Sequence, residues 1–68
     1  MNEIERHKVF RYEEALKRMR AARRESQSAH PDIEDLHWRA DEVLCDFLLD
    51  IGYPELVEEY REIRKWYA

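Results

Sequence analysis

The sequence has few of the residues that interrupt helices. Glycine occurs once and proline twice among 68 residues, while 41% of the residues are charged. This balance suits long amphipathic helices and leaves little for strands or extended loops. We therefore expect an all-α fold. Chains this short are marginal unless helix packing is close to ideal or oligomerisation adds to the core, so self-association is also expected.

Cysteine and long apolar runs are equally scarce. Cys45 is the only cysteine, which excludes a disulfide framework within one chain, and its apolar neighbours predict a reduced, partly buried thiol. No apolar run approaches the roughly 18 to 20 residues of a membrane span, and the first residues lack the apolar core of a signal peptide. We expect a cytoplasmic protein that does not enter membranes.

The net charge of -4 hides a division between the two parts of the chain. Residues 1–24 carry eight basic and four acidic side chains, a balance of +4, whereas residues 25–68 carry four basic and twelve acidic ones, a balance of -8. The two parts are therefore electrically opposite.

The central helix is expected over about residues 33–51, with Asp32 as its cap. Its apolar residues recur at steps of three and four, the spacing of one helical stripe: Ile33, Leu36, Ala40, Val43, Leu44, Phe47, Leu48 and Ile51. A second set, Trp38, Cys45 and Leu49, widens this stripe. The helix should therefore contact two neighbours, or one neighbour and a second copy of the chain.

Two further helices flank it in the sequence. The first is expected over about residues 3–25, starting after an Asn2 cap, and residues 26–31, which include Pro31, form a loop. The third is expected over about residues 54–67, because Gly52 can take the left-handed conformation that closes a helix and Pro54 suits the first helical position. We predict one domain: a three-helix bundle with an antiparallel hairpin of the second and third helices, across which the first packs. Surplus apolar surface on the first two helices predicts a homodimer.

A basic run in the first helix is the leading candidate for binding. Its members are Lys17, Arg18, Arg20, Arg23 and Arg24. Arginine forks match phosphate oxygens, so the run fits a nucleic acid or nucleotide, but it equally fits a protein partner. A third interpretation pairs these charges with the acidic third helix of the same molecule or of a second copy.

The end of the chain carries two large rings, Trp66 and Tyr67. Rings of this size are frequent in binding hot spots, and they also serve to clasp a neighbouring helix. Both interpretations remain open from the sequence.

One polar constellation invites a metal interpretation. Glu34, His37 and Asp41 stand at helical steps, and Glu-x-x-His is half of a di-metal carboxylate site. The third helix adds two Glu-x-x-Glu spacings, Glu55 with Glu58 and Glu59 with Glu62. Such spacings arise readily in an acidic chain, so a solvated helix face is the favoured interpretation and no metal or cofactor is predicted. Catalysis is also not favoured, because Cys45 has acidic neighbours and no glycine-rich loop is present.

The second part of the chain resembles small uncharacterised proteins encoded by bacteriophages and prophages. The resemblance covers about residues 30–68 and rests on four segments: His37-Trp-Arg-Ala-Asp41-Glu-Val-Leu44, Leu48-Leu-Asp-Ile-Gly52-Tyr53, Glu58-Glu-Tyr60 and Lys65-Trp-Tyr-Ala68. It implies a binding role, because short phage proteins often bind and block or redirect a host protein or a nucleotide signal.

These observations favour a non-catalytic protein-protein interaction module, in which Lys17, Arg20, Arg23, Arg24, Trp66 and Tyr67 contact a host or phage protein. Nucleic-acid or nucleotide binding through the basic first helix is the alternative, and a helical metal-dependent hydrolase is a third hypothesis.

Overall fold

The computed structural model describes residues 2–63 and contains three α-helices. These are α1 (Glu3–Ser26), α2 (Ile33–Asp50) and α3 (Pro54–Glu62), and no strand occurs within this part of the chain. The all-α fold predicted from the sequence is therefore confirmed.

The helix starts and the tight turn follow from local side-chain chemistry. The Asn2 side chain accepts a hydrogen bond from the backbone N–H of Glu5 at 2.8 Å, and Asp32 accepts one from Asp35 at 3.1 Å. Both satisfy amide groups that the first turn of a helix leaves without partners. After α2, Gly52 takes φ +97°, which allows the Tyr53 N–H to bond the Leu48 carbonyl at 2.9 Å. Pro54 then opens α3, as expected.

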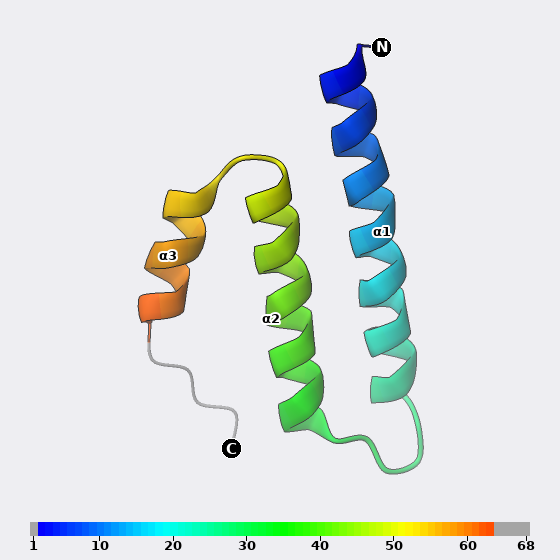
Figure 1. Cartoon of the computed structure of the whole chain (residues 1–68). Helices are drawn as coiled ribbons and strands as arrows, with labels where there is room; N and C mark the ends of the chain where they lie inside the picture. Colours follow the sequence, from blue (N-terminus) through cyan, green and yellow to red (C-terminus); the bar gives the residue numbers. More distant parts are fainter. Residues whose placement is uncertain (1, 64–68) are drawn as a thin grey trace.

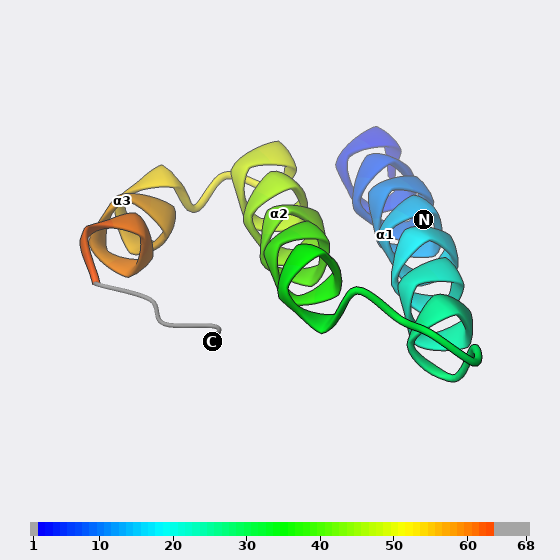
Figure 2. The same ribbon diagram turned by 90° about the horizontal axis from the view of Figure 1, so that it is seen from below.

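The three helices lie side by side in a single layer (Figures 1 and 2). The helix α2 is in the middle and runs antiparallel to both neighbours. In the described part of the chain, α1 and α3 each pack on α2 but do not approach one another. The Cα atoms span 44 × 27 × 8 Å, so the layer is little thicker than one helix.

This layer differs from the expected bundle in how α1 packs. The first helix was expected to lie across the α2/α3 hairpin, but it packs along α2 alone, on the side opposite to α3. The reason lies in α2, whose wide apolar stripe serves two neighbours. Leu36 and Val43 are buried toward α1, and Cys45, which lines a groove with Val57 of α3, is 2% exposed.

The resulting core is small. Within residues 2–63, the buried apolar side chains are Ala22, Leu36, Val43, Cys45 and Val57. Tyr12 of α1 adds an edge-to-face contact with Phe47 of α2, with ring centroids 6.1 Å apart. Cys45 is a free thiol, and it is more fully buried than the partial burial predicted from the sequence. Trp38, which was expected to widen the packed stripe, is 58% exposed.

The third helix is shorter than predicted. It ends at Glu62, and Ile63 has ψ 129°, an extended conformation. The Ile63 side chain is 62% exposed, so it lacks the packing that provides most helix stability in proteins. The predicted continuation over 64–67 lies outside the described residues. Within the described range, no helix is long and apolar enough to cross a membrane.

Candidate protein-binding surfaces

The layer has two broad sides of opposite character, and the sequence of α2 shows why. Ile33, Ala40 and Leu44 are separated by steps of seven and four residues, which keeps them on one side of the helix. Asp35, Glu42 and Asp46 repeat the same steps two positions later. Two residues turn a helix by about 200°, so the carboxylates lie on the side opposite to the apolar residues.

The carboxylate side holds the ion pairs between the helices, and we call it the ion-paired face. Arg18 of α1 lies 3.4 Å from Asp46, Arg11 of α1 lies 4.0 Å from Asp50, and Arg61 of α3 lies 3.6 Å from Glu42. These side chains are about half exposed, so each pair contributes at most about 1 kcal/mol to stability. Their main effect is to place charge along both seams of this face.

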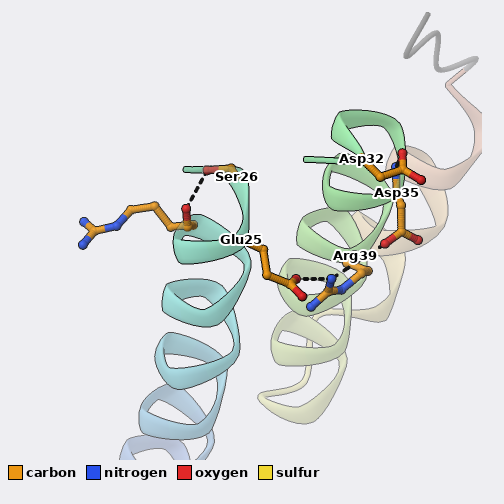
Figure 3. Close-up of polar contacts among 6 residues, drawn as sticks. Glu25, Ser26, Asp32, Asp35 and Arg39 are labelled. Carbon is orange, nitrogen blue, oxygen red and sulfur yellow. Dashed lines mark hydrogen bonds and ion pairs between the residues drawn. The ribbon is translucent and has the colours of Figure 1, made fainter. Parts of the chain in front are cut away.

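A further ion pair joins α1 to the start of α2 (Figure 3). Arg39 of α2 contacts the Glu25 carboxylate of α1 and lies 3.7 Å from Asp35, one turn earlier in its own helix. The hydrogen bond to Glu25 raises the pKa of the Arg39 guanidinium, and the nearby negative charges of Glu25 and Asp35 act in the same direction. Arg39 therefore stays charged and links the two helices beside the interhelical loop.

These pairs correct one interpretation of the basic run. Its charges were expected, if paired internally, to face the acidic third helix, but Arg18 pairs with Asp46 of α2. The physical reason is the layer itself, which keeps α1 and α3 on opposite sides of α2.

The opposite side of the layer carries two apolar grooves. The groove between α1 and α2 is lined by Met19, Ala22, Arg23, Ser26, Ile33, Leu36, His37 and Ala40. The groove between α2 and α3 is lined by Leu44, Cys45, Leu48, Leu56, Val57 and Tyr60. Because Ile33, Ala40 and Leu44 share one side of α2, both grooves open on the same side of the layer.

We call this side the apolar face and define it by six residues: Met19, Ile33, Ala40, Leu44, Leu48 and Leu56. Three of them are strongly exposed: Ile33 by 47%, Leu44 by 52% and Leu56 by 58%. Surplus apolar surface on the first two helices was expected from the sequence, but its extension onto α3 was not. The two-residue offset between the apolar and acidic positions of α2 was the signal that could have located the apolar face on that helix.

The four remaining cations of the basic run form the basic edge: Lys17, Arg20, Arg23 and Arg24. All four are exposed, and within residues 2–63 none of them takes part in an ion pair. Arg18 and Ala22 face α2. Arg20 and Arg24 lie two positions after them, and two residues turn a helix by about 200°, so Arg20 and Arg24 point away from α2. Arg23 lines the groove between α1 and α2. The basic edge therefore borders the apolar face.

The proposed metal constellation is not assembled. Glu34, His37 and Asp41 follow one another on α2, but residues 2–63 contain no group of three or more His, Cys, Asp or Glu side chains placed to hold a metal ion. The Asp41 carboxylate instead accepts a hydrogen bond from the Tyr60 hydroxyl of α3 at 2.7 Å. This bond ties α3 to α2, which gives Asp41 a structural role.

The predicted contact residues Trp66 and Tyr67 lie outside the described residues. The surfaces that the described chain offers are thus the ion-paired face, the apolar face and the basic edge.

Comparisons of the chain with family models, with curated proteins and with solved structures found no match.

Proposed function

We propose that this chain is a non-catalytic protein-protein interaction module that uses the basic edge to bind an acidic surface of another protein. The observation that carries the proposal is the contrast within α1. Arg11 and Arg18 are paired with carboxylates of α2, whereas the four cations of the basic edge are exposed and have no ionic partner in residues 2–63. These four cations lie within eight residues of one helix, so they can act together on a charged partner.

The surroundings of the basic edge favour a protein over a nucleic acid. Arg23 lines an apolar groove beside Met19 and Ile33, and a protein segment can match both the cation and the groove. An acidic helix at the margin of the layer would do so by placing its carboxylates on Arg20 and Arg24, which point away from α2, and its apolar side chains against the rim of the groove beside Arg23. A nucleic acid would also approach the acidic remainder of the chain, whose balance over residues 25–68 is -8.

The partner in this proposal is a host or phage protein that the module blocks or redirects, in line with the resemblance of residues 30–68 to phage proteins. A bacterial lysate is therefore the first source from which to isolate it. Affinity capture on the wild-type chain identifies the partner, and purified partner is then used for titration.

The test compares two variants that lose the same charge from the same helix. Arg20→Ala with Arg24→Ala removes two cations of the basic edge, and Arg6→Ala with Lys8→Ala removes two cations near the start of α1. We expect the first pair to weaken binding of the partner by about tenfold or more, because both cations contact the partner's carboxylates. The control pair should change the affinity by less than about twofold, since rim charges outside the contact act only at long range.

Circular dichroism should show the same helix content for both variants, because all four side chains are exposed. Equal weakening by the two pairs would contradict the proposal. So would a mixed-sequence oligonucleotide that displaces the partner and whose affinity falls steeply with salt, since that result would identify nucleic acid as the ligand.

A further inference from the structure

The apolar face has no second layer of described helices packed on it. Domains normally bury their apolar surfaces between two packed layers, but the described helices form only one. On this single layer the side chains of Ile33, Leu44 and Leu56 are 47%, 52% and 58% exposed. The apolar face therefore leaves large apolar side chains without a packed layer over them.

The shape and position of the face indicate what covers it. It crosses all three helices, from Met19 on α1 through Ile33 and Leu44 on α2 to Leu56 on α3, so its complement is broad and flat rather than a single inserted helix. A second copy of the layer has this shape and this chemistry. Stacking two apolar faces leaves both ion-paired faces in water, where their charges remain solvated.

Two layers can stack face to face with two-fold symmetry in two ways, with the axis parallel to α2 or across the helices. The charges of α1 and α3 favour the first. The helix α1 carries eight basic and five acidic residues, a balance of +3, and α3 carries one basic and four acidic residues, a balance of -3. A two-fold axis parallel to α2 places α1 of one copy over α3 of the other. An axis across the helices would instead place α1 over α1 and α3 over α3, where like charges repel.

We propose that two copies of this chain stack through their apolar faces into a two-layer dimer of six helices, with α1 of each copy over α3 of the other. This dimer is separate from the proposed binding of an acidic partner. Arg20 and Arg24 point away from α2, and so they stay at the margin of the layer.

The first test of the dimer uses two equivalent substitutions on α2. Leu44→Glu places a charge at the centre of the apolar face, where the side chain is 52% exposed in the single chain. Leu49→Glu places the same charge five residues later on α2. Five residues turn a helix by about 140°, so this side chain points away from the apolar face, and it is 40% exposed. Mass is measured by light scattering after size exclusion, and helix content by circular dichroism.

We expect the wild type and Leu49→Glu to have twice the 8.4 kDa of one chain, and Leu44→Glu to have the mass of one chain. A wild type that stays at 8.4 kDa up to about 100 μM would overturn the proposal. Should Leu44→Glu lose its helices, Ile33→Glu at the edge of the same face provides the second variant. Loss of the dimer in Leu49→Glu alone would also overturn the proposal.

The second test addresses the orientation. Met19 is one residue from Arg18, which pairs with Asp46, and Leu56 is one turn before Tyr60, which bonds Asp41. Both residues therefore lie near the level of Cys45 along α2. With the axis parallel to α2, Met19 of one copy lies near Leu56 of the other.

A short bis-maleimide should cross-link the two chains when Met19→Cys and Leu56→Cys variants are mixed, but not when either is present alone. The wild type provides the background from Cys45, which is 2% exposed and so reacts slowly. Cross-linking of Met19→Cys with itself would contradict the proposed orientation.

Discussion

Replacing Val57 by alanine tests whether α3 is held to α2 by the packing that the structure shows. Val57 is the only buried side chain of the described α3, with 2% exposure. Alanine removes two methyl groups, each contributing about 0.8 kcal/mol of burial, and the space left behind adds to the loss. Alanine also favours a helix over valine by about 0.5 kcal/mol. We expect the free energy of unfolding to fall by about 1.5 kcal/mol.

The assay is urea unfolding followed by circular dichroism at 222 nm. With a denaturant dependence of about 1 kcal/mol per molar urea for a protein of this size, the midpoint should fall by about 1.5 M. Val9→Ala is the matched control, because it makes the same change on α1 at a side chain that is 41% exposed. It should lower the midpoint by about 0.5 M or less, since less burial is lost while the gain in helix propensity is the same. Equal shifts for the two variants would refute the packing of α3.

Two further substitutions test the ends of the helices, each by the same urea titration. Gly52→Ala should lower the free energy of unfolding by about 1 to 2 kcal/mol, because alanine is strained at φ +97° although a Cβ there meets no atom within 4 Å; an unchanged midpoint would contradict the left-handed turn. Asp32→Ala should lower it by about 1 kcal/mol by removing the cap on the Asp35 N–H, whereas Asp32→Asn should keep most of that contribution. A loss of similar size for both Asp32 variants would mean that charge, and not the hydrogen bond, is what matters there.

The local features of the fold were predictable because their causes are local in sequence. Asn2 and Asp32 cap the helices they precede, and Gly52 with Pro54 specifies the turn into α3. The periodicity of α2 likewise identified Leu36 and Val43 as part of the packed stripe. Each of these signals depends on residues within a few positions of one another, so no knowledge of the tertiary arrangement is needed.

The arrangement of the helices was not predictable in the same way. An apolar stripe as wide as that of α2 fits two arrangements: both neighbouring helices on the same side of α2, or one neighbour on each side. The structure shows one neighbour on each side, which the sequence does not reveal. The ion partner of Arg18 follows from that arrangement, which explains why Arg18 pairs with α2 and not with α3 of the same molecule. The end of α3 depends on packing at Ile63, which helical spacing does not reveal.

The candidate surfaces were only partly predictable for the same reason. Composition located the cations of the basic edge, but it did not distinguish Arg18, which is paired, from Arg20 and Arg24, which face away from α2. The polar constellation of Glu34, His37 and Asp41 has the spacing of a metal site, yet the position of Tyr60 beside Asp41 could be known only from the packing of α3 on α2.

Sedimentation equilibrium of the wild type from about 1 to 100 μM tests the proposal that a second copy of the chain covers the apolar face. This experiment measures mass without any substitution, and its concentration range covers micromolar affinities. We expect the mass to rise with concentration to twice 8.4 kDa. A mass of 8.4 kDa at every concentration would show that the chain does not form the proposed dimer.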